Sequence, residues 1–261
     1  MKRLLAVFLS TMFSAAAAQE PDVVEIMHRA FKAVKLDGAE ATARLLIFDG
    51  KGNQRERQVV TVSKLYDDGA TEKRLIRFLA PPDVKGTGLL TYDYEKKSDD
   101  MWLFMPALRK TRRIVAAEKA KSFMGSEFSY ADITPPPVED FEHKLLRSEK
   151  AGEVECWVIE SIPRNEDIAQ ENGFSRKLVW IGKPDYVIRR AQQFGFTGEL
   201  EKELEVKKVE EIDREKHRFR PTHMVMHNRK NGRSSEMIMD EVRLRLDIPE
   251  EYFTTRYLER P

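Results

Sequence analysis

The residue types that most often carry catalysis or bind metal ions are scarce in this chain and poorly spaced for either task. The chain has one cysteine, Cys156, so it cannot form an internal disulfide. His223 and His227 in "HMVMH" could share one metal ion only if the segment were helical. The surrounding alternation predicts a strand, on which the two side chains would lie ~13 Å apart at ~3.3 Å per residue. We therefore expect His–acid pairs on the surface here and no metal site.

The sequence carries no motif of a nucleophilic, metal-dependent or nucleotide-binding enzyme. The patterns G-x-S-x-G, H-E-x-x-H, G-x-x-x-x-G-K-[ST] and G-x-G-x-x-G are absent, as is an EF-hand loop. In "VECWVIES", alternation puts Cys156 on one strand face with Val154 and Val158, which is typical of a buried, inert thiol. We therefore predict no catalytic residues, no metal and no cofactor.

The N-terminus is typical of an exported protein. "MKRLLAVFLSTMFSAAAAQE" has two basic residues, an apolar run and a group of small residues that suits cleavage. We expect residues 1–18 to be a signal peptide removed after Ala18. The alternative is a buried N-terminal helix. No cysteine follows the cleavage site, so no lipidation is expected there, and residues 19–261 are predicted to form one domain in the periplasm.

Charge and hydropathy narrow the range of partners. The chain has 45 Lys and Arg residues against 44 Asp and Glu residues, so its overall charge offers no attraction for nucleic acid. No segment beyond the N-terminal one approaches the ~18 apolar residues that a membrane-spanning helix needs. We expect an exported protein that binds no nucleic acid.

One helix followed by about a dozen strands accounts for most of the remaining sequence. "EPDVVEIMHRAFKAVKLDG" has apolar residues at helical spacing, and Gly38 is a plausible end for this helix. From Ala41 to Leu246, short alternating runs are separated by turn residues in the manner of an antiparallel meander. The pattern predicts a large, strongly curved antiparallel sheet or barrel.

The last hairpin of this meander is predicted to carry a methionine surface. Asn231-Gly232 favours a two-residue type I′ turn, which would pair Met226 with Met237 and Met224 with Met239. All four methionines then lie on one face of the hairpin. They could be ordinary core, or a deformable surface for apolar ligands, because methionine adapts its shape to irregular partners.

A segment with large apolar residues but no regular pattern stands between the two groups of strands. "KSFMGSEFSYAD", residues 121–132, has neither strand alternation nor a helical stripe. It follows the basic run "RKTRR" and precedes the turn residues "TPPP". Such a segment could be a permanent part of the core or a cover over an apolar cavity.

Residues 83–133 resemble a known family. "DDMWLFMPALRKTRRI" resembles the W-x-Y-x-P-x-L hairpin of the LolA/LolB superfamily, and "SFMGSEFSYADI" is similar to its outer-membrane lipoprotein-sorting protein branch. The resemblance implies an α+β fold, in which a strongly curved antiparallel sheet forms an incomplete (half) barrel. An N-terminal helix and lid helices or loops would cross its concave face.

The same resemblance implies a carrier of lipids or acylated lipoproteins in the envelope of a Gram-negative bacterium. Such a carrier would touch membranes transiently and could act with an inner-membrane transporter of the RND type. The alternatives are an envelope adaptor or lipid sensor that acts through protein contacts, and an enzyme acting on envelope lipids, for which the sequence supplies no nucleophile–base pair.

Candidate contacts follow from these patterns. The basic residues Arg109, Lys110, Arg112 and Arg113 are candidates for contact with lipid headgroups or an acidic partner, or for a solvated strand end. Two alternation pairs from neighbouring strands are assigned to the inward face: Leu90 with Tyr92, and Trp102 with Phe104. The predicted apolar cavity and lid comprise Leu90, Tyr92, Trp102, Phe104, Phe123, Met124, Phe128, Tyr130, Met224, Met226, Met237 and Met239.

Overall fold

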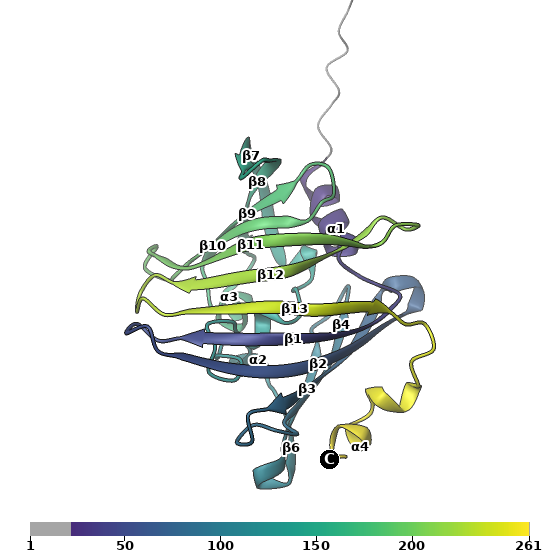
Figure 1. The fold of residues 1–261 in the computed structure, drawn as a ribbon. Coiled ribbons are helices and arrows are strands. Elements are labelled where there is room, and N and C mark those ends of the chain that lie inside the picture. The colour runs from purple at the N-terminus through teal and green to yellow at the C-terminus, as the bar shows by residue number, and fades with distance from the viewer. Residues whose placement is uncertain (1–21, 261) are drawn as a thin grey trace, which may run out of the picture.

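A single sheet organises the computed structural model, which describes residues 22–260 (Figure 1). Within these residues all 13 strands form one antiparallel sheet in the order β6-β5-β4-β3-β2-β1-β13-β12-β11-β10-β9-β8-β7. The strands are β1 (Gly38–Phe48), β2 (Gln54–Tyr66), β3 (Thr71–Ala80), β4 (Gly88–Tyr94), β5 (Asp100–Met105), β6 (Lys110–Arg113), β7 (Phe141–Ala151), β8 (Val154–Pro163), β9 (Arg176–Gly182), β10 (Ile188–Phe194), β11 (Leu200–Asp213), β12 (Arg218–Asn228) and β13 (Ser234–Leu244).

The sheet is open. Strand β1 pairs with β2 on one side and with β13 on the other, so the first and last strands meet in the middle of the sheet. Strands β6 and β7 form its two edges and are not paired with each other. The predicted half-barrel is therefore confirmed, and its strands follow one another as a meander apart from the β1–β13 pairing.

The irregular segment and the α-helices other than the last one lie on the concave side (Figure 1). Leu204 on β11 packs against both apolar clusters of that side, so α1 and residues 121–132 cover one continuous surface. The α-helices are α1 (Val23–Ala33), α2 (Ala116–Lys119), α3 (Glu166–Asn172) and α4 (Thr255–Leu258). Of these, α4 lies on the outer, convex side.

Helix α1 is confirmed, but it is shorter than predicted. Its buried residues Ile26 and Ala30 pack into an apolar cluster with β8, β9 and β10. The helix ends at Ala33, and Gly38 is instead the first residue of β1. A side chain at Gly38 would collide with the chain after β13, because a Cβ there would lie 2.1 Å from the Arg245 carbonyl oxygen.

The final hairpin has a different register from the predicted one. Met224 is opposite Met237 and Met226 is opposite Ser235, a shift of two residues. The side chain of Asn228 accepts hydrogen bonds from the backbone N–H of Lys230 (3.0 Å) and of Asn231 (3.2 Å), which closes a longer loop than a type I′ turn. Because side chains alternate with a period of two, the methionines still share one face.

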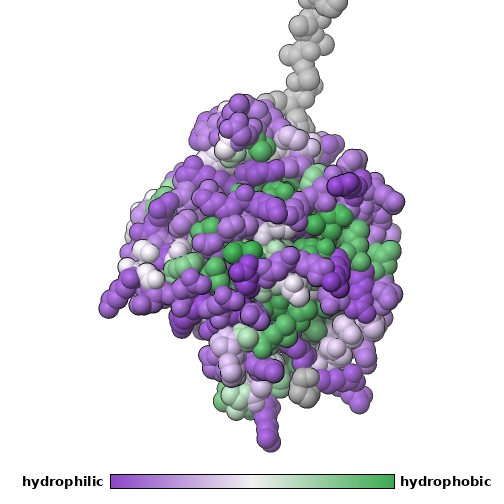
Figure 2. Space-filling view, viewed as in Figure 1, coloured by the Kyte–Doolittle hydropathy of each residue, from purple (hydrophilic) through white to green (hydrophobic). Residues whose placement is uncertain are grey.

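The convex face is mainly hydrophilic in Figure 2, with apolar patches between the charged side chains. Exposed apolar residues include Leu79, Leu244 and Leu246. Among residues 22–260, no helix has the length and apolar character that a membrane crossing requires. The predicted signal peptide, residues 1–18, lies outside the described residues, and the assignment of residues 19–261 to one domain stays a prediction.

Candidate ligand site on the concave face

Residues 121–132, which we call the lid segment, bury their aromatic side chains against the concave face. Phe123 is 1% exposed, and Phe128 and Tyr130 are also buried. The ring centroid of Phe123 lies 5.8 Å from that of Phe78 on β3 and 5.7 Å from that of Tyr130. These are distances at which aromatic rings stabilise one another beyond simple burial. The segment therefore covers the apolar surface like a cap.

The lid segment is folded back on itself by local hydrogen bonds. The backbone N–H of Phe123 donates to the Phe128 carbonyl (2.7 Å), and Ser126 Oγ donates to the Phe123 carbonyl (2.7 Å). At the turn, Met124 and Gly125 both have positive φ, 52° and 76°. Glycine adopts this conformation without a steric cost, which explains why the irregular segment can reverse direction at this point.

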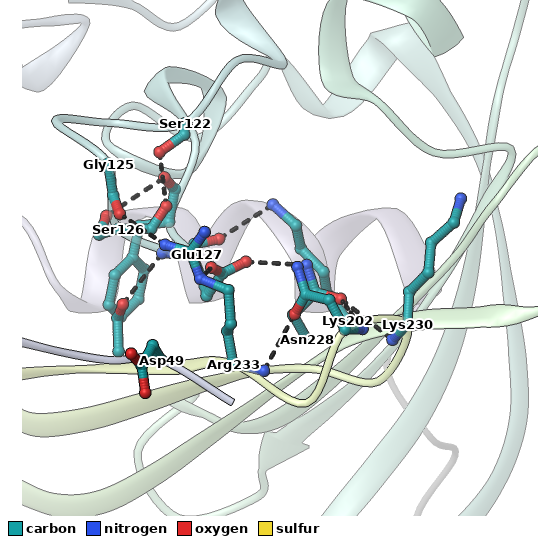
Figure 3. Close-up of polar contacts among 12 residues, drawn as sticks. Asp49, Ser122, Gly125, Ser126, Glu127, Lys202, Asn228, Lys230 and Arg233 are labelled. Atoms are coloured by element: carbon teal, nitrogen blue, oxygen red, sulfur yellow. Dashed lines mark hydrogen bonds and ion pairs between the residues drawn. The ribbon is translucent and has the colours of Figure 1, made fainter. Parts of the chain in front are cut away.

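Polar contacts from the β11–β13 end of the sheet hold the tip of the lid segment (Figure 3). The buried Glu127 carboxylate lies 2.8 Å from Arg233 Nε and accepts a hydrogen bond from Asn228 Nδ2 (2.8 Å). The Glu127 backbone N–H donates to Ser235 Oγ (3.0 Å), and its carbonyl accepts from Lys202 Nζ (2.9 Å). We call these four contacts the polar latches. All of them involve Glu127, so a few interactions hold the tip of the lid segment against the sheet.

Arg233 and a second arginine, Arg57, bind the turn itself. Arg233 Nη2 donates to the Gly125 carbonyl (3.1 Å), and Arg57 on β2 donates to the Met124 carbonyl. The predicted methionine surface lies beneath the segment: Met226 is buried, and the other three are partly buried. The residues of the apolar concave surface under the lid segment include Leu45, Ile47, Val59, Ile76, Phe78, Leu89, Met101, Leu103, Met224, Met226, Met237 and Met239.

The assignment of Leu90, Tyr92, Trp102 and Phe104 to the inward face is wrong. On β4 the residue beneath the lid segment is Leu89, and on β5 the residues are Met101 and Leu103. The neighbouring side chains point to the convex face, where a C-terminal cap that includes Phe253 and Leu258 covers them. The four residues placed on the convex side are Leu90, Tyr92, Trp102 and Phe104.

The C-terminal cap explains this error. Tyr92 Oη donates a hydrogen bond to the Phe253 carbonyl, which fixes the cap to β4. Because both faces of β4 and β5 are covered, Leu89 and Leu90 are both buried despite pointing in opposite directions. Alternation alone could not distinguish the two faces, and large aromatic residues are equally suited to either.

A buried group of charged residues, which sequence analysis missed, occupies the other part of the concave face. Glu72 on β3 is 2% exposed; Arg74 Nη2 lies 2.9 Å from its carboxylate and Arg220 Nη2 lies 3.5 Å from it. Lys35, between α1 and β1, lies 3.2 Å from the carboxylate of Asp93 on β4. We call these five residues the charged cluster. The strand pattern contained a signal, because alternation puts Glu72 and Arg74 on the same face as Phe78.

The two carboxylates of the charged cluster have opposite pKa shifts. Burial would raise the pKa of Glu72, but the nearby Arg74 and Arg220 outweigh it and lower the pKa to about 2. For Asp93 burial dominates and raises the pKa to about 7, although Lys35 acts in the other direction. Glu72 is thus a permanent counter-ion at neutral pH, whereas Asp93 changes its charge near neutrality.

Comparison with known proteins gives the chain its family. A family model described as that of an uncharacterized protein matches residues 70–260. A structure from Vibrio parahaemolyticus, described as an outer membrane lipoprotein-sorting protein domain, is 27% identical with a TM-score of 0.82, over 91% of this chain and 98% of that chain. A DUF1329 family protein from Desulfovibrio piger is also 27% identical with a TM-score of 0.82, over 90% of this chain and 97% of that chain.

The wider fold is shared with a LolA superfamily protein from Nitrosomonas europaea. That structure is 19% identical with a TM-score of 0.68, over 91% of this chain and all of the other. This chain belongs to the family whose model matches residues 70–260, and its structural neighbours are outer membrane lipoprotein-sorting, DUF1329 and LolA superfamily proteins. No curated protein matches the sequence. The resemblance of residues 83–133 to this LolA-like branch is therefore confirmed.

The basic run of this LolA-like chain lies at the sheet edge. Arg109 and Lys110 are exposed at the start of β6. Arg112 Nη1 lies 2.7 Å from the Glu118 carboxylate, and Arg113 pairs with Asp100. The edge therefore offers positive charge, part of which is matched by acidic neighbours. Among residues 22–260, no group of three or more His, Cys, Asp and Glu side chains is arranged to hold a metal ion.

Proposed function

We propose that this protein is a periplasmic carrier that binds the acyl chains of lipids or lipoproteins on its concave apolar surface and moves them across the envelope. The observation that supports this most strongly is the lid segment. It places large apolar side chains on that surface from an irregular stretch of chain, and its tip is held by a few polar latches. A cover of this kind can leave without breaking any strand of the sheet.

The free energy that holds the lid segment closed is comparable to the free energy gained when an acyl chain is buried. Burial of one large apolar side chain is worth ~1.5–3 kcal/mol, so the four apolar residues of the lid segment contribute several kcal/mol to closure. An acyl chain gains ~0.8 kcal/mol per buried CH₂, so about ten buried groups would offset the loss of the lid contacts. Lid and chain can therefore compete for one surface, which a carrier requires for both loading and release.

The relatives support this proposal from a different direction. Two structures of high similarity belong to the lipoprotein-sorting and DUF1329 groups, and the described fold extends over nearly all of both. On this proposal the basic edge at Arg109 and Lys110 touches anionic headgroups during transient membrane contact. Transfer of the lipid or lipoprotein to or from an inner-membrane transporter of the RND type is part of the same proposal. The competing function is an adaptor or sensor that keeps its ligand and acts on other proteins.

Transfer of a fluorescent diacyl lipid between two vesicle populations tests the proposal. We expect the protein to accelerate transfer in proportion to its concentration. Met226→Gln and Met237→Gln together should reduce the rate roughly tenfold, because two polar amides would then face the acyl chain. Gln substitution at the exposed Leu79 and Leu246 is the matched control and should leave the rate unchanged. Binding without any transfer would instead support the adaptor or sensor.

A further inference from the structure

The concave face is divided into a charged zone and an apolar zone, and three strands change from one to the other along their length. On β3, Glu72 and Arg74 are followed on the same face by Ile76 and Phe78, which belong to the apolar cluster under the lid segment. The inward residues in the charged zone are Glu72 and Arg74 on β3, Asp93 and Thr91 on β4, and Arg220 and Thr222 on β12. Their successors toward the apolar zone are Ile76, Leu89 and Met224.

Curvature of the sheet creates the charged zone. Strands β3 and β12 are separated by three other strands, which corresponds to ~19 Å along a flat sheet at ~4.8 Å per step. Nevertheless, Arg220 Nη2 on β12 lies 3.5 Å from Glu72 Oε1 on β3. The two long side chains therefore meet across the hollow of the sheet. Beneath these side chains, β1 contributes only the small side chains of Ala39 and Ala41, which leave space above the sheet.

Several buried polar atoms in this zone have no hydrogen-bond partner within the described part of the chain. Lys35 is 4% exposed and its Nζ is aimed into the cluster, near Asp93 but without a hydrogen bond. Thr91 Oγ1, Thr222 Oγ1, one carboxylate oxygen of Glu72 and both carboxylate oxygens of Asp93 also lack a hydrogen bond, although the two carboxylates are ion-paired with Arg220 and Lys35. Buried polar groups are normally satisfied, so a set of unsatisfied atoms facing one space indicates that a polar ligand group or water belongs there.

A groove at the surface borders this zone at Lys35. It has a volume of about 700 Å³, and Lys35 belongs to both its lining and the charged cluster. The groove is lined by four basic residues, Lys32, Lys35, Lys216 and Arg218, and by three acidic ones, Asp37, Asp67 and Asp68. Deeper in, three basic residues of the charged cluster face Glu72 and Asp93. Three basic groups against two carboxylates leave positive charge in excess there, and burial, which raises the pKa of Asp93, adds to this excess.

We propose that the charged zone binds the phosphate-type anionic group of an amphipathic ligand, between Lys35, Arg74 and Arg220, while the acyl chain of that ligand lies in the apolar zone. This inference rests on the proposed carrier function and adds a class of ligand to it. Guanidinium and ammonium groups are the side chains that bind phosphate oxygens most effectively. The hydroxyls of Thr91 and Thr222 can donate hydrogen bonds to the phosphate from the side that faces the apolar zone.

Native mass spectrometry with three separate probes tests the inference: dioleoylphosphatidate, dioleoylglycerol and inorganic phosphate. The two lipids have the same acyl chains and differ only in the phosphate. We expect the wild type to bind phosphatidate roughly 10- to 100-fold more tightly than dioleoylglycerol. Arg220→Gln should remove most of this preference and leave dioleoylglycerol binding unchanged. Its fold should persist because Arg74 still pairs with Glu72 at 2.9 Å.

Two further variants test whether the preference for phosphatidate depends on the charged zone in particular. Lys35→Met should also reduce the preference for phosphatidate, because it removes one of the three cationic groups. The fold should persist, because Asp93 can take up a proton when its partner is removed. Arg243→Gln, at an exposed position on β13, should leave it unchanged. Equal binding of the two lipids by the wild type would overturn the headgroup assignment and leave the carrier proposal standing.

The remaining outcomes separate the two proposals. If neither lipid binds, the carrier function fails and this inference fails with it. Binding of inorganic phosphate by the wild type without binding of either lipid would also overturn the inference, because the zone would then be a site for a free anion.

Discussion

Phe123→Ala should release the lid segment while leaving the sheet intact. Truncation of a buried phenylalanine typically costs about 3–5 kcal/mol, and Phe123 contacts both Phe78 and Tyr130. If the lid segment opens as a unit, this loss falls on closure and not on global unfolding. Hydrogen exchange of the amides of Phe123 and Tyr130, which are bonded within the segment, should then accelerate roughly 10²- to 10³-fold.

A second phenylalanine provides the control for this experiment. Phe253 is also 1% exposed but lies in the C-terminal cap on the convex face. Phe253→Ala removes the same atoms and should leave exchange in residues 121–132 at the wild-type rate. If Phe123→Ala instead accelerated exchange equally in β1, β2 and the lid segment, the segment would be a permanent part of the core.

The largest effect on stability is expected at Glu72. Glu72→Gln would leave Arg74 and Arg220 largely buried without their counter-ion, and loss of one partner from a buried ion pair costs about 3–5 kcal/mol. At ~2–4 °C per kcal/mol for a domain of this size, thermal unfolding should begin roughly 10 °C lower. Glu241→Gln on the exposed end of β13 is the matched control and should change stability by less than ~0.5 kcal/mol.

The effect of Glu72 should depend on pH with a defined sign. Its pKa falls from 4.5 to about 2 on folding, so its contribution is complete above pH 4.5 and is lost as the pH falls toward 2. The difference in the free energy of unfolding between wild type and Glu72→Gln should therefore shrink over that window. A difference that stayed constant from pH 5 to pH 2.5 would mean that Glu72 does not act as an ionised partner.

The sequence was sufficient for the strands and for side-chain alternation, because both depend on local patterns. The methionine hairpin shows how much such local patterns can predict. Met224, Met226, Met237 and Met239 share the concave face as predicted, although the register differs by two residues. The error came from the turn, where the side chain of Asn228 caps the loop and competes with the type I′ preference of Asn231-Gly232.

Features that depend on distant parts of the chain could not be obtained in this way. Trp102 and Leu90 face outward because residues 248–258 fold back over the convex side, more than a hundred positions later in the sequence. Glu72 meets Arg220 only because the sheet is strongly curved. The lid segment was recognised by its irregular pattern. Its polar contacts, however, come from Asn228 at the end of β12 and from Arg233 in the following loop, which local rules assigned to a different turn.

The central claim is that the concave apolar surface binds an acyl chain when the lid segment leaves it. Native mass spectrometry of the protein, purified from the producing cells without detergent and followed by lipid extraction, tests this most directly. We predict a stoichiometric acylated species, lost when Phe78 and Met226 are replaced by polar residues. A mass equal to that of the polypeptide alone, unchanged after incubation with envelope lipids, would contradict the claim.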